Sequence, residues 1–244
     1  MLATLVQLAV IVQLATPLPS MVPDPMRVKA APIAAAVKHP GPLLVEPEAT
    51  SELSKGFGNP LWALGIATED ESFAHATVLL LEGGSFLKPD TIAHLDAAVA
   101  APKGIAESIR DELDQRLAHA GSPRDTERTQ RDMEQFAHLQ RSGLLVRPVA
   151  LPNGRRGYTS LLGFGPYGAG FMTALQGPND RYELLVLTET AFEGQPPKPN
   201  AQAAIYQEAM RDHPLDVNQA IALAIYAQLW PAPAATPPPD GAPR

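Results

Sequence analysis

The sequence predicts a single α+β domain over residues 51–230, held between two proline-rich arms, and three observations support this fold class. Apolar residues recur at helical spacing up to residue 143, four strand-like segments follow, and turn signals separate those strands. We therefore expect N-terminal helices, a roughly four-stranded antiparallel sheet and two C-terminal helices. The 244-residue chain is 45% hydrophobic and 18% charged, which suffices for one sizeable core.

The first predicted helix of the domain follows Thr68. Thr68 and Glu71 fit a capping box, and Gly83-Gly84 closes the segment. Apolar side chains recur between them at helical spacing, so a helix is expected. A strand ending in the letters VLLLEGG is the alternative interpretation of the same residues.

Three further helices are predicted before the sheet. Asp90 after Pro89 caps the first of them, and Pro102 and Gly104 end it. The next is amphipathic up to Gly121, since it places apolar residues four apart with charges between them. The last begins near residues 123–125 and stops at residue 143. The apolar faces of the second and third consist of Ile105, Ile109, Leu113, Leu117, Met133, Phe136 and Leu139.

Four strands and two helices complete the predicted domain. Asn153-Gly154 is a hairpin signal between the first two strands, and residues 177–180 form a turn between the last two. The last strand has apolar residues on both faces, so we expect it to be central. Asn200 caps one C-terminal helix, and a second, apolar nearly all round, covers Val217–Trp230. The predicted strands are Leu144–Leu151, Gly157–Leu162, Phe171–Gln176 and Arg181–Glu189.

Proline-rich arms flank this domain on both sides. Residues 21–50 are dominated by Pro, Ala and Val, and residues 231–244 repeat that composition. Proline removes a backbone donor and stiffens the chain, so we expect a semi-extended linker and a tail, both disordered.

An apolar run at the N-terminus predicts export. Leu2 to Thr16 is too short to span a bilayer comfortably but suits the apolar core of a signal peptide over residues 1–20. Ser20, after two prolines, suits cleavage, although no Lys or Arg precedes the run. We expect a periplasmic or secreted protein with no stable transmembrane anchor once the signal is cleaved. The alternative is an apolar helix packed on the domain or used for self-association in a cytoplasmic protein.

No catalytic, cofactor or metal site is predicted. Gly163, Gly165 and Gly168 match a dinucleotide fingerprint, but no helix follows to bind the pyrophosphate. Ser85 and Lys88 match S-x-x-K, but Pro89 keeps them off one helical face. The chain has no cysteine, and its six histidines lack metal-ligand spacing.

Residues 105–162 resemble a winged helix-turn-helix. Leu139, Gly143 and Leu144 match the junction that leads from a recognition helix into a two-stranded wing. The resemblance implies a DNA-binding regulator over residues 103–163, with a helix in the major groove and a basic wing tip on phosphate or the minor groove. The nucleic-acid-binding residues would be Arg124, Arg128, Arg131, Arg155 and Arg156. An ordinary junction between helix and sheet is the competing interpretation.

Composition and pattern therefore leave two main functions open. The first is an exported cell-envelope protein without catalytic activity, whose domain binds an unknown protein or ligand. The alternative is a cytoplasmic winged-helix regulator that binds DNA. The net charge of -7 argues against general binding to nucleic acid, although residues 103–156 hold ten basic and eight acidic residues. An enzyme whose site is assembled from distant residues is a third possibility.

Overall fold

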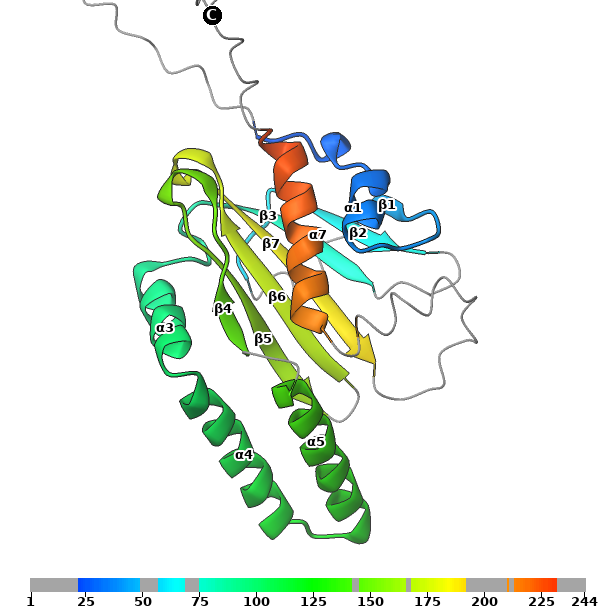
Figure 1. The fold of residues 1–244 in the computed structure, drawn as a ribbon, viewed down its shortest axis with the longest axis vertical. Coiled ribbons are helices and arrows are strands. Elements are labelled where there is room, and N and C mark those ends of the chain that lie inside the picture. Colours follow the sequence, from blue (N-terminus) through cyan, green and yellow to red (C-terminus); the bar gives the residue numbers. More distant parts are fainter. Residues whose placement is uncertain are drawn as a thin grey trace, which may run out of the picture.

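A seven-stranded antiparallel sheet forms the centre of the protein (Figure 1). The computed structural model describes residues 22–48, 57–68, 75–141, 145–165, 168–191, 210 and 213–231. Across the sheet the strands lie in the order β1-β2-β3-β7-β6-β5-β4. Their bounds are β1 Leu44–Pro47, β2 Trp62–Ala67, β3 Ala76–Glu82, β4 Val146–Pro148, β5 Gly157–Gly165, β6 Gly168–Gln176 and β7 Tyr182–Ala191.

The described part of the chain also contains five α-helices, mostly in the middle of the sequence. Short 3-10 turns η1, η2 and η3 cover Pro25–Arg27, Pro152–Gly154 and Pro178–Asp180. The α-helices are α1 Ala30–Ala36, α3 Pro89–Ala100, α4 Pro102–Ala118, α5 Pro123–Arg141 and α7 Pro214–Leu229.

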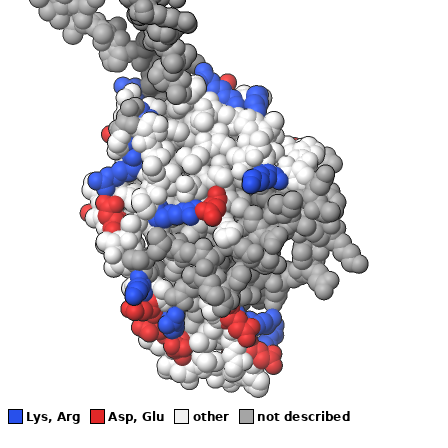
Figure 2. All heavy atoms as spheres, viewed as in Figure 1, with Lys and Arg blue, Asp and Glu red and all other residues white. Residues whose placement is uncertain are grey.

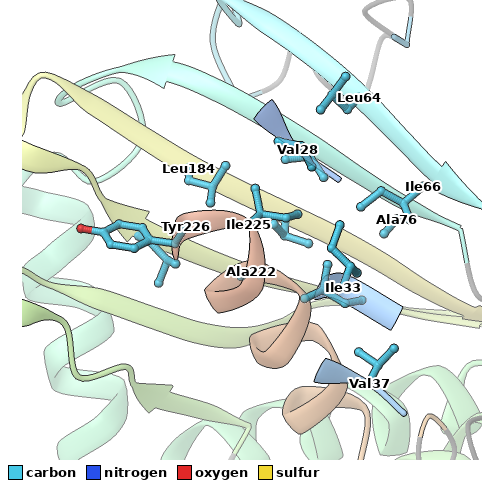
Figure 3. Close-up of a cluster of buried hydrophobic side chains, with 14 of the residues drawn as sticks. Val28, Ile33, Val37, Leu64, Ile66, Ala76, Leu184, Ala222, Ile225 and Tyr226 are labelled. Atoms are coloured by element: carbon cyan, nitrogen blue, oxygen red, sulfur yellow. The ribbon is translucent and has the colours of Figure 1, made fainter. Parts of the chain in front are cut away.

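The sheet has a separate apolar core on each face, because side chains alternate along the central strands. In β7, Leu184 and Val186 pack toward α7 and α1, whereas Leu185 and Leu187 pack toward α3. Figure 3 shows the first cluster, in which side chains from α1, α7 and the sheet meet. Both faces of β7 are thus covered, which confirms its predicted central position.

The predicted sheet of four strands preceded by helices is wrong. The four predicted strands correspond to β4, β5, β6 and β7, but β1, β2 and β3 extend the sheet on the far side of β7. Residues 76–82 form β3 instead of a helix. Strand β3 pairs with β2 on one side and β7 on the other, and its residues Val78 to Leu81 are fully buried. A strand that is covered on both faces has a continuous apolar sequence, and periodicity cannot distinguish such a sequence from a buried helix.

The predicted pair of C-terminal helices is also corrected. The described part of the chain contains one, α7, which matches the predicted segment Val217–Trp230. The other prediction, from Asn200 to before Pro214, falls outside the described residues except for Met210 and His213.

The expectation of a disordered proline-rich arm before the domain is wrong as well. Within residues 22–48 the chain forms α1 and the edge strand β1, and Ile33 is fully buried against α7 and the sheet. The prolines are accommodated where no backbone donor is needed. Pro25 and Pro32 lie in first helical turns, and Pro47 ends an edge strand.

Two hydrogen bonds fix this N-terminal segment to the fold. The Trp62 indole Nε1 donates to the Pro23 carbonyl at 2.8 Å, and the Lys29 amide donates to Gln228 Oε1 at 2.7 Å. The predicted signal peptide (residues 1–20) and the predicted tail beyond Pro231 lie outside the described residues.

Candidate binding groove

A hollow of the described structure lies between helices α3 and α4 and the β4–β5 end of the sheet. Its volume is about 640 Å³, within the range of about 300–1,000 Å³ that is common for ligand sites. Most of its lining is apolar. The lining residues are His94, Leu95, Ala98, Gly104, Ser108, Ile109, Glu112, Leu113, Arg116, Leu145, Val146, Ser160, Leu161 and Leu162. We refer to this hollow as the groove.

One wall of the groove belongs to a helical hairpin that extends past the end of the sheet (Figure 1). Helices α4 and α5 pack on each other through a small cluster of their own. Its buried members are Ala106 and Leu113 of α4, Phe136 of α5, and Leu145, which directly precedes β4. Since α4 packs mainly on α5, part of its side that faces the sheet stays uncovered and borders the groove.

Polar side chains follow a single line along α4. Ser108, Glu112 and Arg116 are four residues apart, so they lie on one face of the helix above the apolar floor. Arg116 forms an ion pair with Glu112, and the two side chains are 48% and 60% exposed. An exposed pair of this spacing contributes only about 0.3–0.5 kcal/mol, so either charge can be redirected toward a ligand at little cost.

The floor of the groove is irregular where β5 bends. The register between β5 and β6 shifts between Leu161 and Gly163, which leaves Leu162 in a β-bulge. Leu162 lines the groove and is 39% exposed, although it belongs to a strand of the sheet. Ser160, in contrast, is 4% exposed and places a hydroxyl at the same end. The bulge therefore supplies an accessible apolar side chain at the groove wall.

Two smaller hollows adjoin the groove along α4. One, of about 500 Å³, is lined by Gly104, Glu107, Ser108, Asp111, Glu112 and Gln115 and is acidic. The other, of about 430 Å³, lies at the hairpin tip, where Arg116, His119, Asp125, Arg128 and Asp132 are among its lining residues. Burial raises the pKa of the Asp132 carboxyl, while the charges of Arg128, Arg116 and Arg131 oppose that increase.

The two arginines predicted for a wing tip have partners within the fold. Arg155 donates to the Tyr226 hydroxyl at 2.8 Å, and Arg156 forms an ion pair with Asp96 at 2.7 Å. Asp96 also accepts from the Tyr158 hydroxyl at 2.6 Å. This hydrogen bond from Tyr158, together with Arg156, lowers the pKa of Asp96. Both arginines directly precede β5. Arg155 contacts α7 and Arg156 contacts α3. The strands β4 and β5 are the last two strands of the seven-stranded sheet.

The other three predicted arginines lie at the opposite end of the molecule. Arg124, Arg128 and Arg131 occupy the first half of α5, near the hairpin tip. Arg155 and Arg156 directly precede β5, which begins at the end of the sheet away from the hairpin (Figure 1). The structure thus brings each group together but not the two groups with each other. Figure 2 shows basic and acidic side chains alternating over this hairpin.

The glycine motif lies in paired strands. Gly163 belongs to β5, and Gly168 to β6, so the segment is a hairpin between two strands, with no helix after it. Ser85 and Lys88 lie in the loop before α3, which the buried carboxylate of Glu183 holds by accepting from the amides of Gly84, Phe86 and Leu87.

Within the described ranges, no three acidic or histidine side chains converge in a way that would hold a metal ion. The helices in those same ranges include none with the length and apolar character needed to cross a bilayer.

Comparison with known proteins finds no matching family model, no similar curated protein and no similar solved structure. The groove must therefore be judged on its geometry alone. Sequence reasoning missed it because its lining comes from α3, α4 and the β4–β5 end together. The one local signal was the line of Ser108, Glu112 and Arg116 on an otherwise ordinary amphipathic helix.

Proposed function

We propose that this protein is a non-catalytic binding domain of the cell envelope, and that it holds a ligand or partner segment with apolar groups in the groove. The observation that carries the proposal is the hollow of about 640 Å³ between α3, α4 and the end of the sheet. Sites of this kind combine an apolar lining with a few polar groups that orient the ligand. Here Ser108, Glu112 and Arg116 are such groups, since they border a floor of apolar side chains.

Leu162 provides the variant for the test, because it lines the groove and is 39% exposed. Replacing Leu162 with Glu places a charge on the wall that would contact an apolar ligand, and burying an unpaired charge is costly. Leu61 is the matched control, since it is 38% exposed against 39% for Leu162 and lies outside the groove lining.

The probe is the neutral apolar dye Nile red, titrated against the full chain and followed by fluorescence. The proposal predicts that Leu162→Glu raises the Kd at least about tenfold, which corresponds to about 1.4 kcal/mol, while Leu61→Glu leaves the Kd unchanged. An equal Kd of Nile red for the wild type and both variants would show that the dye does not bind in the groove. Circular dichroism of each variant confirms that the fold is retained.

The cell-envelope location is supported by the sequence of residues 1–20. Its test is the intact mass of the protein, carrying a C-terminal tag, recovered from periplasmic and cytosolic fractions of a Gram-negative host. A periplasmic species that begins near Met21 agrees with export. An uncleaved cytosolic species contradicts this part of the proposal.

Binding to DNA through residues 103–163 stays a prediction of the sequence. Replacing both Arg155 and Arg156 with Ala would weaken such binding and reduce its dependence on salt, because fewer phosphates would be neutralised. In the fold these arginines have Tyr226 and Asp96 as partners, so the same variants must also be checked for stability.

A further inference from the structure

The hollow of about 430 Å³ at the tip of the α4–α5 hairpin has a floor and a rim of different character. Its floor contains two buried polar side chains of α5, Thr129 at 7% and Asp132 at 3% exposure. The rim consists of exposed charged or titratable side chains from both helices and the turn between them. These rim residues are Arg116, His119, Asp125 and Arg128. We refer to this hollow as the tip hollow.

Asp132 is the residue of the tip hollow that folding does not explain. Its Oδ1 is buried and has no hydrogen-bond partner among the described residues, although buried polar atoms are nearly always paired. Burial also raises the pKa of its carboxyl, so its charge is costly to keep at neutral pH. A titratable side chain held in a hollow at such a cost indicates a binding site, because proteins lose stability where function requires it.

The rim of the tip hollow can adjust to a ligand. The hairpin extends past the end of the sheet, so its tip consists of two helices alone (Figure 1). Arg116 is held there only by its exposed ion pair with Glu112, and exposed pairs of this kind contribute little to stability. The Arg116 guanidinium can therefore turn from Glu112 toward an anionic group on a ligand.

The charges around the tip hollow decide which kind of ligand fits. Asp132 Oδ1 needs a hydrogen-bond donor, and an ammonium group supplies one together with the opposite charge. The positive charges of Arg128 and Arg116 act on the Asp132 carboxyl, so they would repel a simple cation. A simple anion would be repelled by Asp132 and would leave its oxygen unpaired. Two acidic and two basic side chains line the hollow, so a ligand with both charges complements it.

We infer that the tip hollow binds a small amino carboxylate, such as a free α-amino acid. The ligand ammonium donates to Asp132 Oδ1 at the floor, and the ligand carboxylate binds the Arg116 guanidinium at the rim. This inference goes beyond the proposed function, because it assigns a second site for a ligand of different chemistry. The tip hollow and the groove share only Arg116 among their lining residues.

The probes are L-alanine and three analogues that each lack one feature, titrated against the full chain and followed by the NMR shifts of backbone amides. N-acetyl-L-alanine lacks the ammonium, and L-alaninamide lacks the carboxylate. N,N,N-trimethyl-L-alanine keeps both charges but has no N–H donor. The inference predicts that L-alanine shifts the amides of Thr129 and Asp132 and has a Kd at least about tenfold lower than that of each analogue.

Asp132→Asn is the main variant, because it separates binding from folding. It should raise the Kd of L-alanine at least about tenfold, while the loss of a buried charge leaves the fold at least as stable as wild type. Arg116→Gln should remove the preference for L-alanine over L-alaninamide. Asp114→Asn and Arg110→Gln, exposed changes on α4 outside the lining, are the matched controls and should keep the wild-type Kd.

Four outcomes would overturn the inference. If L-alanine causes no shift, or if Asp132→Asn keeps the wild-type Kd, an ordered water suffices as the partner of Asp132. Equal binding of N-acetyl-L-alanine would assign the rim to anions, and equal binding of L-alaninamide would assign the floor to cations. Equal binding of the trimethyl compound would exclude the hydrogen bond to Asp132. Leu162→Glu should leave the Kd of L-alanine unchanged, so failure at this site is distinguishable from failure at the groove.

Discussion

Asn218 Nδ2 in helix α7 lies 2.9 Å from Thr188 Oγ1 in strand β7, and both side chains are buried in the protein interior. The same amide donates to the Val186 carbonyl at 3.2 Å, and Asn218 Oδ1 accepts from the Thr173 hydroxyl. Thr173 in turn shares a hydrogen bond of 2.8 Å with Thr159. One side chain of α7 thereby connects β5, β6 and β7 through polar groups that have no access to water.

Replacing Asn218 with Ala should destabilise the fold by about 2–4 kcal/mol, because it leaves buried hydroxyl groups unpaired and opens a small cavity. Chemical denaturation at neutral pH measures the change. Gln219→Ala, the neighbouring position on the same helix, should cost less than about 1 kcal/mol. An Asn218→Ala protein as stable as wild type would show that the polar connection contributes nothing to α7 docking.

Glu183→Gln should loosen the loop before α3. The Glu183 carboxylate accepts amides from Gly84 at 2.6 Å, Phe86 at 2.7 Å and Leu87 at 3.2 Å, and the glutamine NH₂ would instead face a donor. We expect a loss of about 2–3 kcal/mol and faster hydrogen exchange at those three amides. Glu82→Gln, an exposed change in β3, is the control. Unchanged exchange at the three amides would contradict this role for Glu183.

Asp132→Asn should stabilise the hairpin at neutral pH. Asp132 is 3% exposed, its Oδ1 has no hydrogen-bond partner, and burial raises its pKa above the ordinary value. A carboxyl whose folded pKa exceeds its unfolded pKa stabilises the fold when protonated, and this contribution is lost as pH rises from about 4 to the raised pKa.

Thermal unfolding from acid to neutral pH measures this effect. Wild type should lose stability across that window relative to Asp132→Asn, and the exposed change Asp114→Asn should behave like wild type. Parallel pH profiles for wild type and Asp132→Asn would show that burial does not penalise this charge.

Tyr158→Phe should raise the pKa of Asp96, and Arg156→Ala should raise it as well. The Tyr158 hydroxyl is the largest single cause of the lowered pKa of Asp96, and Arg156 lowers that pKa through a hydrogen bond and through its charge. A carboxyl whose folded pKa is lowered stabilises the fold above its unfolded pKa, and that contribution is lost as pH falls through the folded pKa. NMR titration of the Asp96 carboxyl in each variant measures both changes. An unchanged pKa in Tyr158→Phe would contradict the role of this hydrogen bond.

Local patterns predicted the elements whose burial is one-sided. Helices α4 and α5 follow from apolar residues such as Ile109 and Leu113 at helical spacing. The turn at residues 177–180 was likewise predicted from its own composition, and η3 occupies it. Helix α7 was also predicted, because its apolar residues and capping signals are contiguous.

The remaining features depend on contacts between distant residues. Strand β3 was mistaken for a helix because burial on both faces removes the two-residue alternation that identifies a strand. The prolines of residues 22–48, such as Pro32, indicated an arm without a fold. Helix α1 is instead held by the packing of Ile33 on α7, a contact between distant residues that the local sequence does not reveal. Asn218 lies in a helix whose other buried residues are mostly apolar, and only its hydrogen-bond partners in β6 and β7 explain it. The groove likewise needs α3, α4 and β5 in place before its lining exists.

Site-specific photo-crosslinking tests most directly whether the groove is the binding site. The full chain would carry a benzoyl-phenylalanine at Leu162 or, in a separate protein, at Leu61, two positions of nearly equal exposure. After irradiation in the cells that produce the protein, mass spectrometry of the purified chain identifies the adducts. The account predicts a discrete adduct at Leu162 that is absent at Leu61 and is suppressed when Ser108→Trp fills the groove. Equal adducts at both positions, or none at Leu162, would contradict it.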